Sequence, residues 1–175
     1  IILCLLTCGC VSKFTPESLV GDAWHTVLNI KNSGEQTMSL TMKSETATFD
    51  LTLLKVGSEP NYVSKATLKV MDYARMSEIL RYGDYSILHA SLFDFDPDIE
   101  FAPEETGKFV TITIRQKQVL ENLRNHPETE FILPLILVSD RDSVNVNKNY
   151  TFLGFRDGNV SKQISWASLS IVSCD

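Results

Sequence analysis

The chain lacks any cluster of basic residues. Its 16 lysines and arginines are spread among 22 aspartates and glutamates, which gives a formal net charge of −6 over 175 residues. Nucleic-acid binders neutralise phosphates with clustered Lys and Arg, and proteins attracted to anionic membrane surfaces carry a polybasic segment. The composition therefore argues against nucleic acid as a partner and against electrostatic attachment to a membrane.

Motifs of catalysis and metal binding are also missing. His25, His89 and His126 are far apart in the sequence, with no pair at helical spacing and no neighbouring metal-ligand cysteine. The sequence contains no Gly-x-Ser-x-Gly nucleophile elbow and no phosphate-binding loop. We therefore predict a non-catalytic protein without a cofactor or a bound metal.

The densest group of carboxylates is the stretch from Asp94 to Glu100. Three aspartates at alternate positions resemble the start of a calcium loop, but Ile99 stands where that loop needs glycine and Pro97 stiffens its middle. A glycosidase pair of carboxylates is the other catalytic option, and a small sandwich without a deep cleft disfavours it. We expect an exposed turn that leads into a strand with a charged outer face.

No hydrophobic run is long enough to span a bilayer. The run from Ile1 to Thr7 is apolar and uncharged, and small residues follow it, as in the second half of a secretion signal whose basic start would precede Ile1. Gly9-Cys10 resembles the end of a bacterial lipobox, in which the cysteine is lipidated and becomes the new N-terminus. We favour lipidation at Cys10 over two alternatives, an ordinary cleaved signal and a buried N-terminal strand.

Cysteine is scarce in the part of the chain that would remain after such processing. Cys4 and Cys8 would leave with the signal and Cys10 would carry lipid, so that only Cys174 would be left. The mature chain would then have no internal disulfide, and its core must hold the fold. A lipidated cysteine carries two or more acyl chains, which is enough for stable anchoring.

What the sequence has in abundance is short runs in which apolar and polar residues alternate. This period of two is typical of strands with one buried face. We expect such strands at residues 38–42, 49–53, 66–70, 110–114 and 150–155. Apolar residues three and four apart predict a short helix from Asp72 to Tyr82 that covers one end of a sandwich, and one or two helical turns between Gln116 and Asn125.

The run from Thr129 to Ser139 differs, because it is apolar on both sides of an extended chain. Such a run predicts a strand that is covered on both faces. Pro134 within it cannot donate to a ladder, so we expect a bulge or an edge at that point. Together these patterns predict an all-β, immunoglobulin-like β-sandwich with one short lid helix.

We divide the chain into a partial lipoprotein signal peptide at residues 1–9, a tether at 10–27 and a β-sandwich domain at 28–155. Residues 156–175 are a linker followed by a strand that either completes the domain or begins a second, truncated domain. The Cys–Trp–Cys core of true immunoglobulin domains is absent, so the prediction concerns the architecture alone.

Four segments resemble a family of unknown-function domains found at the N-terminus of many Bacteroidetes lipoproteins. They are Tyr82–Leu88, with its Gly-x-x-Tyr-x-Leu-Leu element, Ile99–Gly107, Val110–Ile114 and Glu130–Ile136, with its Leu-Pro-Leu strand. Their order and spacing cover roughly residues 28–155. The chain departs from the family at His89, where proline is usual, and at Phe131, where tyrosine is usual.

The resemblance implies an outer-membrane lipoprotein, often encoded beside glycan-uptake machinery, that faces either the cell surface or the periplasm. Its partners would be the membrane, through the lipid, and a polysaccharide or an outer-membrane glycan transporter complex. Aromatic rings stack on sugar faces, and Tyr62 and Trp166 are our candidate ligand-binding residues. The alternatives are a structural spacer or adhesin-like subunit without a ligand, and the leading domain of a larger glycoside hydrolase.

Overall fold

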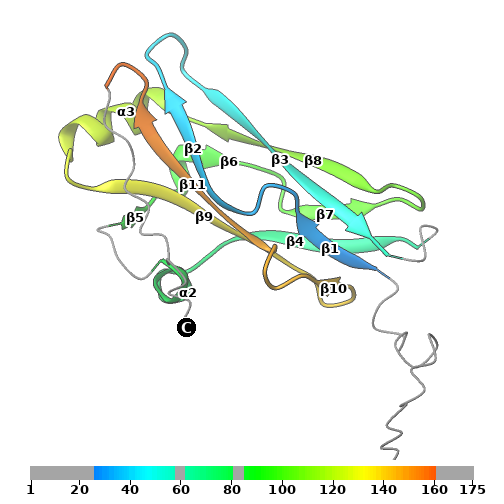
Figure 1. Cartoon of the computed structure of the whole chain (residues 1–175). Coiled ribbons are helices and arrows are strands. Elements are labelled where there is room, and N and C mark those ends of the chain that lie inside the picture. Colours follow the sequence, from blue (N-terminus) through cyan, green and yellow to red (C-terminus); the bar gives the residue numbers. More distant parts are fainter. Residues whose placement is uncertain (1–25, 58–61, 81–84, 161–175) are drawn as a thin grey trace, which may run out of the picture.

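In the part of the chain that the structure describes, the protein folds as a sandwich of two β-sheets with two short α-helices (Figure 1). The computed structural model describes residues 26–57, 62–80 and 85–160. The predicted all-β sandwich with a short helix is confirmed. Within the described ranges, no helix is long and apolar enough to cross a membrane.

The first sheet, sheet A, has the strand order β10-β1-β3-β8-β6. Its centre is the long antiparallel pair formed by β3 and β8, which matches Ala47 with Ile114 at one end and Leu54 with Gly107 at the other. Its strands are β1 (Val27–Ile30), β3 (Ala47–Val56), β6 (Phe93–Asp94), β8 (Gly107–Ile114) and β10 (Ser143–Val144).

The second sheet, sheet B, has the order β2-β11-β9-β4-β7, and β5 pairs with one end of β9. Two of its pairings are parallel, β11 with β2 and β5 with β9. Its strands are β2 (Gly34–Leu40), β4 (Ser64–Val70), β5 (Tyr85–Ile87), β7 (Asp98–Phe101), β9 (Glu130–Val138) and β11 (Tyr150–Asp157).

The predicted strand at residues 129–139 is β9, and it lies in the middle of sheet B. Leu133, Leu135 and Leu137 face the core between the sheets, while Ile132 belongs to a second apolar cluster on the opposite face. Both faces of β9 are therefore covered, as its sequence predicts. Burial of apolar surface on two sides makes this strand the centre of the hydrophobic stabilisation of sheet B.

Pro134 fits into β9 because the neighbouring strand changes at that point. On one side β9 pairs with β5 up to Ile132 and with β4 from Leu135 onward. The carbonyl of Pro134 faces this side, where it accepts a 2.8 Å hydrogen bond from the Met71 N–H. An N–H at Pro134 would face the same side, in the gap between the two partner strands, so its absence breaks no ladder bond. The predicted local edge is confirmed.

The helix predicted from Asp72 is α2 (Tyr73–Ile79), and it begins where the sequence indicates. The Asp72 carboxylate caps it by accepting a 2.7 Å hydrogen bond from the Arg75 N–H. Its position differs from the expected one, because α2 covers the outer face of sheet B and not an end of the sandwich. Met76 of the helix joins Ile132 and Phe152 in the second apolar cluster, which lies outside the two-sheet core.

The end of the sandwich is instead closed by α3 (Gln116–Asn125), which links sheet A to sheet B (Figure 1). Val119 and Leu120 of α3 are fully buried in the core. Gln116 is also buried, and its amide nitrogen donates to the Ser44 carbonyl at 2.8 Å while its amide oxygen accepts from the Thr41 N–H. These bonds fix the loop between β2 and β3, which crosses from one sheet to the other.

Candidate functional site

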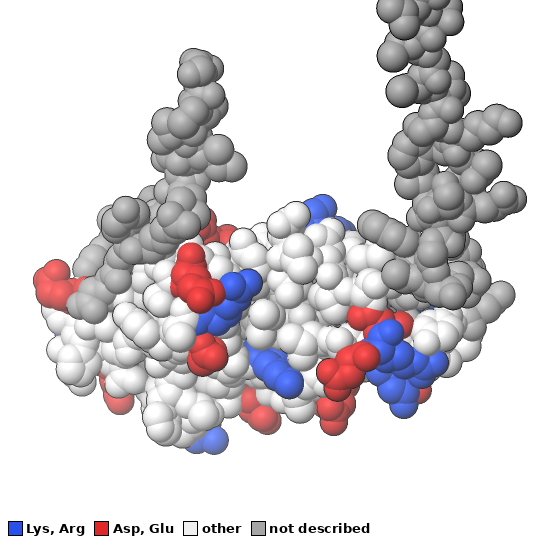
Figure 2. Space-filling view, turned by 90° about the horizontal axis from the view of Figure 1, so that it is seen from below, with Lys and Arg blue, Asp and Glu red and all other residues white. Residues whose placement is uncertain are grey.

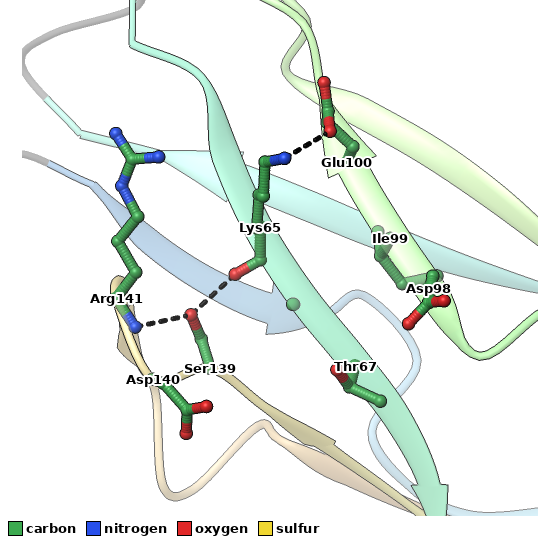
Figure 3. Close-up of a pocket in the computed structure, with 9 residues that line it drawn as sticks. Lys65, Thr67, Asp98, Ile99, Glu100, Ser139, Asp140 and Arg141 are labelled. Carbon is green, nitrogen blue, oxygen red and sulfur yellow. Dashed lines mark hydrogen bonds and ion pairs between the residues drawn. The ribbon is translucent and has the colours of Figure 1, made fainter.

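An open groove lies on the outer face of sheet B, beside the part that α2 covers (Figure 3). Strand β4 forms its floor, β7 one wall and the loop after β9 the other wall. Its volume is about 440 Å³. The groove is lined by Lys65, Ala66 and Thr67 of β4, Asp98, Ile99 and Glu100 of β7, and Ser139, Asp140 and Arg141 of the loop.

The groove exists because β9 ends before it reaches the first residues of β4, which therefore have no strand beside them on that side. Their pairing stops at Val138, opposite Thr67, which leaves the backbone of Lys65 without a neighbouring strand on that side. Two loop side chains replace it. The Ser139 hydroxyl donates to the Lys65 carbonyl at 2.6 Å, and the Asp142 carboxylate accepts from the Lys65 N–H at 2.8 Å. The loop is thereby held at a fixed position along one wall.

One end of the groove is bridged by an ion pair across β4 and β7. The ammonium of Lys65 lies 2.8 Å from the Glu100 carboxylate, and both side chains are exposed. The hydrogen bond from Lys65 and the positive charge of Lys65 hold the pKa of Glu100 below its usual value. Solvent screens an exposed pair of this kind, so it acts mainly to orient the two side chains.

The wall formed by the loop is connected to Tyr62 through Arg141. The Arg141 Nε donates to the Tyr62 hydroxyl at 2.6 Å, and the guanidinium carbon lies 4.6 Å from the centre of the ring. The Tyr62 carbonyl accepts a 2.9 Å hydrogen bond from the Lys55 ammonium, which also donates to Ala102 at 2.8 Å. Lys55 is only 4% exposed, so a buried cation ties the Tyr62 segment to sheet A.

The acidic stretch behaves as a turn followed by a strand, as its sequence predicts. Asp96 accepts a hydrogen bond from the Asp98 N–H at 3.0 Å, which closes the turn. In β7 the exposed Asp98 and Glu100 alternate with the buried Ile99 and Phe101. Within the ranges that the structure describes, no three potential metal ligands come together.

The structure places Tyr62 in a half-buried position next to the groove. Tyr85 is buried under α2, and Tyr73 is 60% exposed on α2 itself. The exposed aromatic that sequence analysis did not single out is Phe109, which is 71% exposed on the outer face of sheet A. The other two residues that the sequence analysis singled out, Trp166 and Cys10, lie outside the described residues.

Most of the groove residues were not found from sequence. Lys65, Thr67 and Ser139 occur in strands and loops whose pattern indicates solvent exposure alone. Asp98 and Glu100 are the exception. Their alternation with Ile99 and Phe101 predicts that both carboxylates lie on the outer face of one strand. Nothing in the sequence indicates that Arg141 reaches Tyr62, because 79 positions separate the two residues.

Charged side chains of both signs are mixed on one face of the molecule. Figure 2 shows acidic and basic side chains interspersed on the face seen from below, with much uncharged surface between them. No basic stripe crosses the described part of that face. The charge of this face is therefore mixed and not predominantly basic.

No protein-family model matches the sequence, and no curated protein matches it closely enough to be counted as a relative. Solved structures do share its fold. A proposed carbohydrate-binding protein of Bacteroides ovatus superposes with a TM-score of 0.60 at 15% identity, over 74% of this chain and 36% of that one. The matched region is thus little more than a third of that protein.

Two other solved structures are similar over a comparable region. A multidomain Bacteroides ovatus protein that includes a DUF1735 domain has a TM-score of 0.54 at 12% identity, over 76% of this chain and 44% of that one. A Bacteroides thetaiotaomicron protein crystallised with a Man5GlcNAc product has a TM-score of 0.54 at 14% identity, over 74% and 30% of the two chains. At these identities the likeness shows a shared fold, and the neighbours are Bacteroides proteins of unknown function or with a link to carbohydrate.

Proposed function

We propose that this chain is a non-catalytic glycan-binding domain whose ligand lies in the groove between β4, β7 and the loop after β9. The observation that carries the proposal is the groove itself, an exposed channel whose walls present carboxylates, a hydroxyl, an ammonium and a guanidinium. Sugars are recognised by such fixed polar groups together with an aromatic ring, and Tyr62 stands beside the channel.

The support from known structures concerns the class of ligand. Among the proteins with this fold are a proposed carbohydrate-binding protein and a protein that was crystallised with a glycan product. The support from this chain concerns the place. Arg141 and Tyr62 are held by side-chain contacts that fix their geometry before any ligand arrives, which lowers the entropic cost of binding.

The test is affinity electrophoresis of the full chain in mild detergent, through native gels that contain yeast mannan or barley β-glucan. We expect the unaltered protein to be retarded by at least one polymer. Tyr62→Ala removes the ring beside the groove and should weaken binding about threefold to tenfold, as expected for loss of about 0.5–1.5 kcal/mol of ring contact.

Tyr73→Ala is the control, because it removes a ring of the same size from the surface of α2, away from the groove residues. It should leave retardation unchanged. If Tyr62→Ala and Tyr73→Ala changed retardation equally, the glycan would not bind in the groove. No retardation by any polymer would favour the alternative, a structural spacer or adhesin-like subunit without a ligand of its own.

The same domain also fits a role beside another module. The chain matches 30–46% of the length of several solved proteins that share the fold, which therefore contain further domains or segments. In a larger glycoside hydrolase this domain would hold the polymer while another domain cleaves it. Discovery of a longer reading frame that encodes a catalytic domain would support this second candidate.

We further propose that Cys10 carries lipid and anchors the protein in the outer membrane, facing either the surface or the periplasm. The support is the apolar run before Gly9-Cys10 in the sequence. In the native host, Cys10→Ala should move the protein from the detergent phase to the aqueous phase of a Triton X-114 partition. An unchanged distribution would contradict the anchor.

A further inference from the structure

Two carboxylates of the groove have no partner among the described residues. The side chains of Asp98 and Asp140 form neither a hydrogen bond nor an ion pair there, and both residues are exposed. Figure 3 shows them on either side of Thr67, toward the end of the groove away from the Lys65–Glu100 pair.

The two cations of the groove are, by contrast, already engaged. The Lys65 ammonium is paired with the Glu100 carboxylate, whereas the Arg141 Nε bonds to the neutral hydroxyl of Tyr62, so that Arg141 keeps its positive charge. The lining residues contain three carboxylates, those of Asp98, Glu100 and Asp140, and two cations, so the groove has a net charge of −1. Unpaired carboxylates accept strong hydrogen bonds from hydroxyl groups, whereas a carboxylate or sulfate brought beside them would be repelled.

We infer that the groove selects glycans without acidic groups, with Asp98 and Asp140 as the residues that reject uronate and sulfate. This inference rests on the glycan-binding function proposed above and adds its substrate class. Hydroxyl groups of a neutral glycan would donate to the carboxylates on both sides of Thr67. In a polyuronate, each sugar would place a negative charge within the same short channel. Moderate salt would screen the resulting repulsion only in part.

The experiment compares neutral and acidic polymers on the same protein. The full chain is passed through gels containing yeast mannan, barley β-glucan, polygalacturonate or alginate, at about 20 and 200 mM salt. We expect retardation by a neutral polymer and at least tenfold weaker retardation by both acidic ones. The preference for neutral over acidic polymers should decrease as the salt concentration rises, since salt screens the repulsion between the groove carboxylates and the acidic sugars.

The double variant Asp98→Asn, Asp140→Asn removes both negative charges and keeps the size of the side chains. In this variant, the ratio of retardation by neutral polymers to retardation by acidic polymers should fall by threefold or more. The double variant Asp50→Asn, Glu121→Gln is the matched control, because it removes the same number of negative charges from β3 and α3, away from the groove, and it should leave the difference as it was. Because the two groove aspartates lie on the surface, neither substitution should change the unfolding midpoint.

The outcomes separate this inference from the function on which it rests. Equal retardation by neutral and acidic polymers would overturn the selectivity and leave glycan binding in place. A preference for neutral polymers that survives in the double variant would also overturn it, because the two carboxylates would then not be the cause. No retardation by any of the four polymers would overturn the proposed function and this inference together.

Discussion

The outer face of sheet B has two halves with opposite surfaces. Over β9 and β11 it is apolar and covered by α2, which buries Met76 against Ile132 and Phe152. Over β4 and β7 it is polar and open, and it forms the groove with Lys65 and Asp98 on its walls. The same sheet therefore uses one half of this face for stability and offers the other half to solvent and ligand.

The difference arises from the pattern of side chains along neighbouring strands. Strand β9 carries apolar residues on both sides, so leaving its outer side open would expose them to water. Strands β4 and β7 alternate, and their outer side chains are charged or hydroxylated. A helix over the second half would bury those polar groups without partners, at a cost of about 1–3 kcal/mol for each.

The largest effect expected from this contrast is on stability. Phe152→Ala should lower the free energy of unfolding by about 3–5 kcal/mol, because it empties space between β11 and α2. Thr67→Ala in the open half should change it by less than about 0.5 kcal/mol. Urea unfolding followed by circular dichroism measures both. A similar small cost for the two substitutions would show that α2 does not cover a packed layer.

An intermediate effect is expected at the buried lysine that supports the open half. Lys55→Met keeps the apolar stem but removes the donor to the carbonyls of Tyr62 and Ala102. We expect a loss of about 1–3 kcal/mol, since two hydrogen bonds from a charged donor would be lost. Lys69→Met, on the exposed side of β4, is the control and should be nearly neutral. An unchanged urea midpoint for Lys55→Met would mean that other donors replace the ammonium.

The sequence predicts that the outer side of β9 is covered, but it does not predict that α2 is the element that covers it. The run at residues 129–139 is apolar on both sides, and this alone requires a second layer. The helical spacing of Met76 and Leu80 predicts a helix that buries one face, and Asp72 marks its start. Spacing says nothing about where such a face docks. The helix was expected at one end of the sandwich, whereas α2 covers the outer face of sheet B and α3 closes an end.

The open half was predictable only in part, because it depends on contacts between distant segments. Alternation identifies the outer residues of β4 and β7 but not which strands are neighbours. The loop wall depends on Ser139 and Asp142 binding the backbone of Lys65, over 70 residues earlier in the chain. Polar groups of a loop fit many partners equally well, so their sequence does not select one. The short strand β1 was not assigned either, as four residues carry little periodicity.

The smallest effect expected is on stability at low pH. It differs between a carboxylate at the end of the sandwich that α3 closes and a carboxylate in the groove. Asp157 is held by a hydrogen bond from the Asn159 N–H and by Arg124 of α3, and these contacts lower its pKa. Its side chain is 9% exposed, whereas that of Glu100, whose pKa Lys65 also lowers, is 61% exposed. Solvent therefore screens the charge of Glu100 more strongly than that of Asp157.

Both carboxylates stabilise the folded state while they are ionised. Because each folded pKa lies below the unfolded value, this stabilisation is complete above the unfolded pKa and is lost as the pH falls through the folded pKa. For Asp157 the loss begins as the pH approaches its ordinary pKa of 3.8. Thermal unfolding between pH 7 and 3 should show a flatter acid limb for Asp157→Asn than for the unaltered protein, and a smaller change for Glu100→Gln. A larger change for Glu100→Gln would mean that the groove, and not the contact of α3 with β11, controls the acid stability of the fold.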